Sequence, residues 1–386
     1  MNGKANQTPA ARSLRDVCAI GLSFMSRMLR GFSGIGLSGT CRLVVPTLVW
    51  LLAGAPVRAT AGAAVAKYAG EFIAIGVGGR ALGLGGAYSA LANDVTAGYW
   101  NPAGLSKMMY PQVTLMHDER FGGLVNYDYA AFALPAGVST SFGISLIRLG
   151  VDDIPNTQNA GVDINGNPIP PDQLQKLAGI DPSRVTYFNA ADWAFYFSYS
   201  KKAGDQFSYG ANIKFIRREL GTASATGVGF DLGMQFSPTE RLLIGANAQD
   251  ITTTLVAWNT GRNELISPTL KAGSAYLIDL FGGQVAPAID VDFRFEGRKS
   301  ASNAHIGRVS MDFHSGLEYE YKNLAALRIG YSDIKSLNIG TGIHLPKLDI
   351  DYSFARFDQR DLGDTHRISL TFTLEAEQFR RTTDSR

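Results

Sequence analysis

The sequence predicts an all-β fold, a transmembrane antiparallel β-barrel of about 14 strands. From Gln112 onward, apolar and polar residues alternate with a period of two, which is the pattern of strands with two different faces. Many of these runs exceed ten residues, whereas strands of soluble sheets centre on about five or six. Their apolar faces are aromatic and their polar faces carry glycine and charges, as in barrels that meet lipid. A soluble sandwich is the alternative, and it predicts a lysine-rich polar face instead.

Composition narrows the class of protein further. The 386 residues are 45% apolar and 18% charged, with 43 glycines and a formal net charge of +2. A charged fraction this low, with glycine above its usual share of about 7%, argues against disorder, coiled coil and nucleic-acid binding. Residues 1–61 hold seven basic residues and one acid, a net +6, so residues 62–386 carry −4.

The first 61 residues are predicted to be a signal peptide or leader. A basic region precedes a short apolar run at 43–57, and Ala59-Thr60-Ala61 follows it, so cleavage is expected after Ala61. A membrane anchor needs about 20 apolar residues, and Pro46 and Pro56 interrupt this run. Both cysteines of the chain fall in the leader, so the exported protein is expected to lack disulfides. The predicted location is the outer membrane of a Gram-negative bacterium.

Fourteen candidate strands follow in order, an even number, as a closed bacterial barrel requires. They are expected to begin near Gln112, Val125, Ser139, Phe188, Phe207, Ser224, Leu242, Pro268, Gln284, Arg308, Leu324, Lys335, Lys347 and His366. Tight turns alternate with longer loops, which predicts periplasmic turns at one end and extracellular loops at the other.

The longest connection, residues 151–186, is the surface expected to contact a partner. Long loops without strands of their own are usually functional or disordered. Its Asp163–Asn167 stretch resembles a calcium loop, but Pro168 and Leu174 stand where glycine and glutamate are needed. A plain turn is therefore predicted there, followed by a short helix over Gln173–Ala178.

Residues 62–111 form a separate segment before the barrel. Gly76–Gly86 is rich in glycine, Ala87–Asp94 is expected to form a short helix, and Trp100–Leu105 is expected to be a turn. Gly76–Ala81 also fits a dinucleotide-binding pattern, but the alternating strands downstream do not supply the βαβ unit which that pattern requires. The glycines are interpreted as positions of close backbone packing.

The stretches Gly70–Tyr88 and Asn93–Leu105 resemble the N-terminal signature of the PorV/PorQ family, within the FadL-like outer-membrane barrels. The resemblance implies that residues 62–111 are a plug in the lumen of a barrel formed by residues 112–376. The chain departs from the usual pattern at its end, where a polar tail, residues 377–386, follows the last strand. The signature residues that the resemblance assigns to the plug are Arg80, Gly85, Gly86, Asn101, Pro102, Ala103 and Gly104.

The polar faces of the strands place charged residues in the lumen. They are interpreted either as a selectivity path or catalytic dyad, or as a structural network in which Arg80 pairs with wall carboxylates. Mixed charge is normal in barrel interiors, which favours the structural network. The five histidines lack the spacing of a metal site or a triad, so no metal, cofactor or catalytic residue is predicted and an enzyme is not expected. The predicted lumen-facing charges are Asp192, Lys214, Asp231, Asp290, Asp292, Arg294, Asp312, Glu318, Arg328, Asp349, Asp351 and Arg367.

The resemblance implies two possible functions for a barrel surrounded by outer-membrane lipid. PorV-like proteins serve the type IX secretion system, so the first is the transfer of exported cargo to the cell surface, with secretion components or cargo contacting residues 151–186. The second, implied by the FadL side of the resemblance, is passive uptake of a small hydrophobic ligand. Uptake predicts an apolar pocket between the plug and the wall, and a wholly polar interior would count against it.

Overall fold

The computed structural model describes residues 70–295, 302–333, 336–357 and 364–382. By its contacts the chain divides into two units, Met1–Ala63 and Ala64–Arg386, and every described residue belongs to the second. The predicted leader and its cleavage site after Ala61 therefore lie outside the described residues. Within the described ranges, no helix has both the length and the apolar character needed to cross a membrane.

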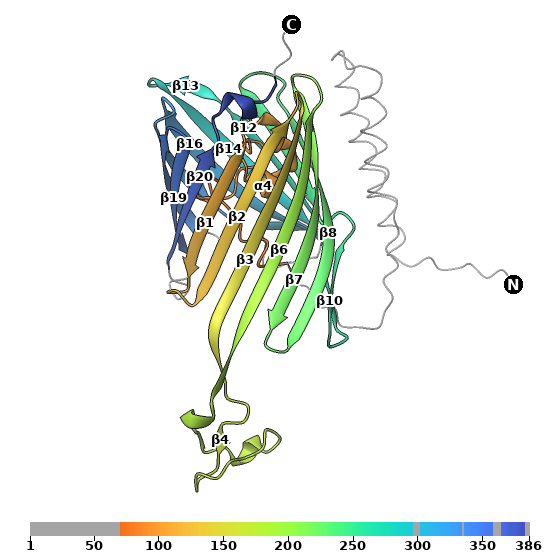
Figure 1. The fold of residues 1–386 in the computed structure, drawn as a ribbon, viewed down its shortest axis with the longest axis vertical. Helices are drawn as coiled ribbons and strands as arrows, with labels where there is room; N and C mark the ends of the chain where they lie inside the picture. Colours follow the sequence, from red (N-terminus) through yellow and green to blue (C-terminus); the bar gives the residue numbers. More distant parts are fainter. Residues whose placement is uncertain (1–69, 296–301, 334–335, 358–363, 383–386) are drawn as a thin grey trace, which may run out of the picture. The chain divides into compact units, whose positions relative to one another are not determined.

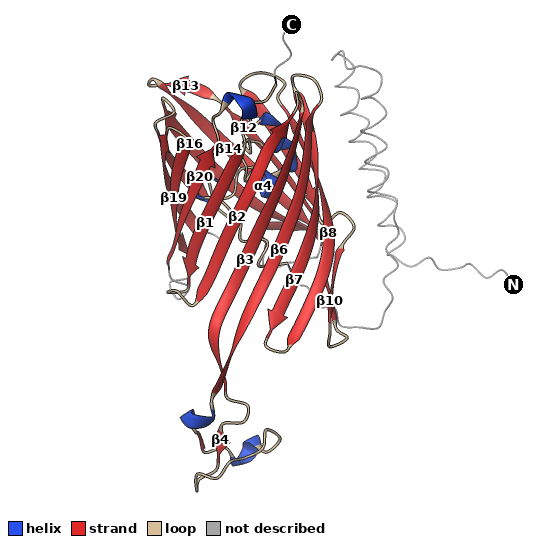
Figure 2. Ribbon diagram, in the orientation of Figure 1, coloured by secondary structure: helices blue, strands red, loops and turns tan. Residues whose placement is uncertain are grey.

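The described unit is a closed antiparallel barrel of fourteen strands with short helices inside it (Figure 1, Figure 2). This confirms the fold class predicted from the sequence. The barrel closes where β1 (Gln112–Arg120) pairs with β20 (Asp364–Thr373). Between them run β2 (Val125–Ala136), β3 (Thr140–Asn156), β6 (Thr186–Lys202), β7 (Phe207–Leu220), β8 (Ala223–Phe236), β9 (Leu242–Gln249), β12 (Thr269–Tyr276), β14 (Gly283–Arg294), β16 (Val309–Tyr321), β17 (Ala325–Tyr331), β18 (Ser336–Leu345) and β19 (Leu348–Phe357).

The alternation of the sequence maps onto the two faces of the wall. Along β6, Phe195 and Phe197 are 41% and 53% exposed, whereas Ala194 and Tyr196, which alternate with them, are buried. Successive strand residues point to opposite faces, so one face meets the surroundings and the other the lumen. Every predicted strand consequently begins within two residues of its observed start.

Four short strands of the described wall were not predicted from the sequence. β10 (Thr254–Trp258) and β11 (Asn263–Ile266) form a hairpin that pairs with β8 beyond the end of β9, where a loop was expected. β13 (Ile278–Leu280) pairs with β14, and β15 (Ala304–Ile306) pairs with β16. Segments of three to five residues are too short for a period of two to identify.

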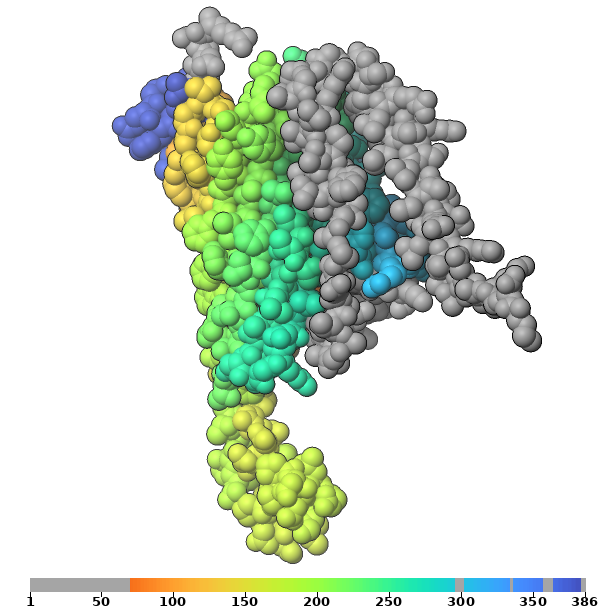
Figure 3. All heavy atoms as spheres, turned by 90° about the vertical axis from the view of Figure 1, so that its right-hand side faces the viewer, coloured from red at the N-terminus to blue at the C-terminus, as the bar shows by residue number. Residues whose placement is uncertain are grey.

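The β3–β6 hairpin is longer than predicted, and residues 157–185 form a knob at its tip (Figure 3). The knob differs from the expected loop because it contains its own strands, β4 (Gly161–Val162) and β5 (Gly179–Ile180), and the 3-10 helices η3 (Leu174–Lys176) and η4 (Pro182–Arg184). Asp163 forms a turn in which its Oδ1 accepts the N–H groups of Asn165 and Asn167, each at 2.8 Å. Of the helix predicted over Gln173–Ala178, only the single turn η3 forms.

The plug consists of short helices and turns. Its regular elements are α3 (Gly79–Gly83), α4 (Ala97–Trp100) and the 3-10 helix η2 (Pro102–Lys107). The turn expected at Trp100–Leu105 is therefore the junction of two helices. Asn101 separates them with an extended backbone, which ends α4 and caps η2.

The helix expected over Ala87–Asp94 is not formed, because the wall satisfies the backbone there. The carboxylate of Asp290 accepts the N–H groups of Tyr88 and Ser89. The amide of Gln235 donates to three carbonyls between Ser89 and Ala92, at 2.9 to 3.3 Å. These contacts come from strands far along the chain, so local sequence does not reveal them.

The residues after β20 return to the end of the plug. After the 3-10 turn η6 (Glu377–Phe379), Arg381 is buried, and its guanidinium donates to the carbonyls of Met108, Val138 and Thr140 at 2.8 to 3.2 Å. It also donates to Ser141 Oγ at 2.6 Å. The polar tail thus ties the exit of the plug to the turn between β2 and β3.

Candidate functional site: the plug and the lumen wall

The structure places Arg80 of α3 against a chain of alternating charges on the wall. Its Nε and Nη2 donate to the two carboxylate oxygens of Glu318 at 2.9 and 2.7 Å. Glu318 also accepts from Nε of Arg328 at 2.6 Å, and Nη1 of Arg328 donates to Asp351 at 2.6 Å. Burial alone lowers the pKa of Arg80, but the neighbouring carboxylate outweighs it and holds that pKa well above its ordinary value. Arg80 therefore stays charged and anchors the plug.

Gly85 and Gly86 let the plug turn while it touches the wall. Both have positive φ, 66° and 85°, which disfavours residues with a Cβ. A Cβ on Gly85 would lie 2.7 Å from the backbone nitrogen of Tyr331. On the wall side, a Cβ on Gly330 would overlap the backbone of Leu84. Plug and wall therefore meet backbone to backbone at this point.

The Asn101–Gly104 motif forms the corner between α4 and η2. The Oδ1 of Asn101 accepts the N–H of Ala103 at 3.3 Å, and its Nδ2 donates to the carbonyls of Ser89 and Met234 at 2.9 and 3.0 Å. The proline that follows occupies the first turn of η2, where its missing N–H costs nothing. Gly104 packs so closely on the plug's own backbone that a Cβ has no room. One asparagine thus joins two parts of the plug to β8.

Neutral amides of the wall also hold the plug, and the sequence analysis missed them. Nδ2 of Asn212 donates to the carbonyl of Gly98 at 2.8 Å, and Nδ2 of Asn247 donates to that of Trp100 at 2.9 Å. Gln235 makes the contacts described above. The prediction considered only charged groups in the lumen. In the sequence, these amides alternate with apolar residues that face outward. This alternation places them on the lumen side and could have identified them.

Lys214 and Asp231 lie together in a buried cluster that includes Asp250. The Nζ of Lys214 is 2.8 Å from a carboxylate oxygen of each aspartate, and the side chain is 1% exposed. Thr254 donates to the second oxygen of Asp250 at 2.5 Å. A buried ion is tolerated only when it is paired and hydrogen-bonded, which describes this cluster. Asp250 was missed because it lies in a turn after β9, with φ 54°, outside the alternating pattern.

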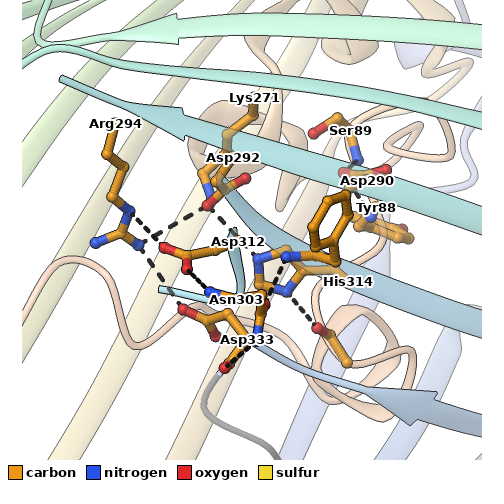
Figure 4. A network of polar contacts seen from close by, with 12 residues as sticks. Tyr88, Ser89, Lys271, Asp290, Asp292, Arg294, Asn303, Asp312, His314 and Asp333 are labelled. Carbon is orange, nitrogen blue, oxygen red and sulfur yellow. Dashed lines mark hydrogen bonds and ion pairs between the residues drawn. The ribbon is translucent and has the colours of Figure 1, made fainter. Parts of the chain in front are cut away.

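A second network joins β12, β14 and β16 (Figure 4). Asp292 lies 2.5 Å from Nζ of Lys271 and 3.6 Å from Nε2 of His314. Arg294 lies 3.5 Å from Asp312 and 3.9 Å from Asp292. The structure therefore brings together three of the predicted lumen charges, Asp292, Arg294 and Asp312.

This part of the wall contacts the backbone of the plug. Asp290, on the same face of β14, accepts the N–H groups of Tyr88 and Ser89 at 3.2 and 2.8 Å (Figure 4). Nδ1 of His314 lies 2.8 Å from the carbonyl oxygen of Gly85. Because these wall groups contact main-chain atoms, they fix the path of the plug whatever its side chains are.

The other predicted lumen charges form separate pairs along the wall. These are Asp192 with Arg218 at 2.8 Å, Arg367 with Asp118 at 3.0 Å, and Asp349 with Nδ1 of His344 at 2.8 Å. The predicted charges thus lie in several pairs and clusters that stabilise the wall or position the plug. The geometry does not arrange them as a single path or dyad.

A cavity of about 50 Å³ lies where the first described residues of the plug meet the wall. It is lined by Gly70, Glu71, Ile73, Ala74, Tyr99, Gln249, Asp250, Ile266, Ser267, Thr269, Lys271 and Arg294. The lining is neither wholly apolar nor wholly polar. Its volume is about a third of the ~150 Å³ cavity that holds benzene in an engineered protein core, so in this state an aromatic ring does not fit.

Comparisons with known proteins give a match to a family model over part of the chain, and a fold. Residues 52–229 match the model of an uncharacterised protein family, UPF0164. No protein with a curated description matches the sequence. Solved structures match over most of the chain. They include the CymD monoaromatic hydrocarbon channel (TM-score 0.56, 14% identity, 78% of this chain and 98% of that one).

Two further solved structures agree with it. They are the toluene transporter TodX of P. putida (TM-score 0.55, 13% identity, 78% and 99% of the two chains) and the toluene transporter TbuX of Ralstonia pickettii (0.51, 15%, 77% and 98%). The chain has the fold of these FadL-like barrels. At such low identity the likeness concerns the fold alone.

The outer surface of the barrel suits lipid. The outward faces of β14, β16, β17 and β18 carry no charged side chain in the described residues, and Ile289, Leu317, Leu327 and Ile339 on them are 43% to 62% exposed. Apolar outer faces and polar inner faces are the arrangement of a membrane barrel.

Proposed function

We propose that the protein is a passive channel through which small hydrophobic compounds cross the outer membrane of a Gram-negative bacterium, after export directed by residues 1–61. The observation that carries this proposal is a closed, plugged barrel with the fold of solved hydrocarbon channels. Many polar groups of the lumen hold the plug or pair with one another along the wall, which supports a channel rather than an enzyme. Passage then depends on diffusion and on movement of the plug.

Uptake of a hydrophobic compound requires apolar surface between the plug and the wall, and the cavity has apolar residues in its lining. Ile73 and Ala74 of the plug and Ile266 of the wall are among the residues that line the cavity. Because the cavity holds only about 50 Å³, a compound of aromatic size passes only if the plug shifts. The structure thus corresponds to a closed state of the proposed channel.

The secretion role implied by the resemblance to PorV/PorQ has less support. The solved structures named above are a channel and transporters for hydrocarbons, which favours uptake. A deletion strain separates the two roles. Loss of uptake with unchanged secreted proteins supports the channel, and the reverse result supports the secretion role.

A disulfide between plug and wall tests whether passage requires plug movement. An ideal Cβ at Gly98 of α4 lies 3.9 Å from the Cβ of Ser198 on β6, within the range of natural disulfides. The double variant Gly98→Cys, Ser198→Cys places the only cysteines in the predicted mature chain. We expect uptake of radiolabelled toluene by intact cells to fall at least tenfold when this pair is oxidised and to recover on reduction.

The matched control is a disulfide within the wall. Thr114 of β1 and Thr371 of β20 are partners in register, with hydroxyl oxygens 2.9 Å apart. Thr114→Cys with Thr371→Cys crosslinks two strands and leaves the plug unattached. Equal toluene uptake by the oxidised plug-locked and wall-locked proteins would contradict the proposal.

A further inference from the structure

Two grooves lie in the outer wall of the barrel, one on each side of β6. The first lies over β20, β1, β2 and β3 and has a volume of about 550 Å³, and the second lies over β7, β8 and β10 and has a volume of about 490 Å³. Both volumes fall within the range of about 300–1,000 Å³ that small-ligand sites have. Apolar residues that point outward line both grooves, among them Leu115, Leu146 and Leu370 in the first and Phe215, Val228 and Leu255 in the second.

An arginine stands in the lining of each groove, and a tryptophan separates the two arginines. Arg148 of β3 lines the first groove and Arg217 of β7 lines the second. Trp193 of β6 is the register partner of both, so the three side chains are neighbours on the outward face. The guanidinium carbon of Arg148 lies 5.5 Å from the centre of the Trp193 ring. Two cations thus flank one aromatic side chain at the junction of the grooves.

This trio has the character of a membrane–water boundary. Charged side chains on a lipid-facing surface are costly at the midplane of a bilayer and cost little near its interfaces, where tryptophan is also enriched. The trio lies toward the end of the barrel that carries the knob, since Arg217 is close to Leu220, the last residue of β7. We therefore expect the trio to lie at the level of the lipid headgroups.

Space for a headgroup lies next to Trp193. Two residues nearer the knob, the outward positions are Gly150 of β3 and Ala191 of β6, which are register partners. A Cβ on Gly150 would lie 2.7 Å from Nη2 of Arg148, so the guanidinium lies over the backbone at this glycine. No side chain larger than a methyl group therefore stands at these two positions.

Both arginines keep N–H donors for a further acceptor. Nη1 of Arg148 donates to Asp128 at 3.4 Å, and its Nη2 lies 3.9 Å from Asp152. Nε and Nη2 of Arg217 contact a single oxygen of Glu219, each at 3.1 Å. The two arginine side chains are 27% and 44% exposed. A guanidinium has five N–H donors in a fork that matches phosphate oxygens, so these contacts leave donors unused on both arginines.

We propose that the two grooves and their arginines bind one phosphate-bearing lipid of the surrounding membrane, with its acyl chains in the grooves and an anionic phosphate between Arg148 and Arg217. The apolar linings continue the lipid-facing surface of the barrel, so acyl chains reach them directly. Guanidinium groups at the headgroup level attract an anionic phosphate. A zwitterionic headgroup fits less well, because it brings an ammonium group close to two cations. The inference does not depend on the channel function.

Fluorescence of Trp193 tests this proposal, because brominated acyl chains quench a tryptophan on contact. Among the described tryptophans, Trp100 belongs to the plug and Trp258 packs against the buried core, so Trp193 is the one that meets lipid. The full-length exported protein is reconstituted in phosphatidylcholine with brominated chains, and unbrominated dioleoylphosphatidic acid or dioleoylphosphatidylcholine is added. The variant Trp193→Phe measures the signal of the other tryptophans, which is subtracted. We expect phosphatidic acid to relieve the quenching about tenfold more effectively than phosphatidylcholine.

The double variant Arg148→Gln, Arg217→Gln should lose this preference for phosphatidic acid. Arg356→Gln is the matched control and should keep it, because Arg356 is an exposed arginine of β19 outside both grooves. Equal effects of the two lipids on the native protein overturn the inference, whether or not the double variant folds. A preference that survives in the double variant, or that Arg356→Gln also removes, overturns it as well. If brominated phosphatidylcholine alone does not quench Trp193, a second copy of the chain covers the grooves, and the inference fails.

Discussion

Arg80 of the plug and Glu318 of the wall are 238 residues apart in the chain and form a two-pronged ion pair at 2.9 and 2.7 Å. The Glu318 side chain is 4% exposed, and the same carboxylate accepts a hydrogen bond from Arg328 at 2.6 Å. One carboxylate therefore holds α3 of the plug and balances an arginine of the wall. This sharing makes Glu318 the residue whose loss affects both parts at once.

We expect Glu318→Gln to lower the free energy of unfolding by roughly 3 kcal/mol, because removing one member of a buried ion pair leaves its partner uncompensated. The measurement is urea unfolding of the purified protein. Glu320→Gln is the control, since Glu320 lies on the same strand face and forms no ion pair within the described ranges. Equal unfolding midpoints for the two variants would show that the shared carboxylate is unimportant.

A second prediction concerns the backbone contact between plug and wall. Gly330→Ala introduces a methyl group where the backbone of Leu84 and Gly85 lies, and overpacking of this kind costs about 1–3 kcal/mol. Because the wall is held by ladders on both sides, we expect the plug to move instead. Single-channel conductance in planar bilayers should increase.

The control for this variant is Gly150→Ala. A Cβ at Gly150 meets only the flexible end of the Arg148 side chain, so it should leave the conductance unchanged. If Gly330→Ala keeps the native conductance, the plug is not seated against this glycine as tightly as the geometry indicates.

The barrel was predictable from the sequence because a period of two survives in every long strand. The outward residues of β6, Phe195 and Phe197, are enough to fix its register, since a shift by one residue would exchange the two faces. The hairpin of β10 and β11 carries too few residues for such a pattern.

The plug was predictable only in outline, because contacts with distant strands decide its backbone. The sequence of Ala87–Asp94 predicts a helix. In the structure, however, Asp290 and Gln235 of the wall hydrogen-bond to backbone N–H and carbonyl groups of this segment. The charged residues of the lumen were identified from their inward register. Which of these charges pair with one another could not be predicted, since Arg80 and Glu318 meet only when the barrel closes around the plug.

A third prediction concerns the corner of the plug. Asn101→Ala removes two donors, to the carbonyls of Ser89 and Met234, and the cap of η2. We expect the free energy of unfolding to fall by about 2–3 kcal/mol, from the lost cap and the unpaired carbonyls. Asn165→Ala in the exposed turn of the knob should stay within about 0.5 kcal/mol. A loss at Asn101 no larger than this would contradict a structural role for the corner.

The fourth prediction is a pH dependence that originates in the plug. Burial, and to a lesser extent the charge of Lys202, lowers the pKa of Lys107 from its ordinary 10.5 to about 8. Between pH 8 and 10.5 the unfolded chain therefore binds more protons at this residue than the folded protein does, so the free energy of unfolding rises with pH across this window.

The variant Lys107→Gln removes the penalty of the buried charge. We expect it to be more stable than the native protein at pH 7 by up to roughly 3 kcal/mol, and we expect this difference to vanish above pH 10.5. Urea unfolding of both proteins at several pH values measures this, and Lys322→Gln, which removes an exposed lysine from the turn after β16, should keep the native slope. If Lys107→Gln also keeps it, the amine of Lys107 is not buried as the structure places it.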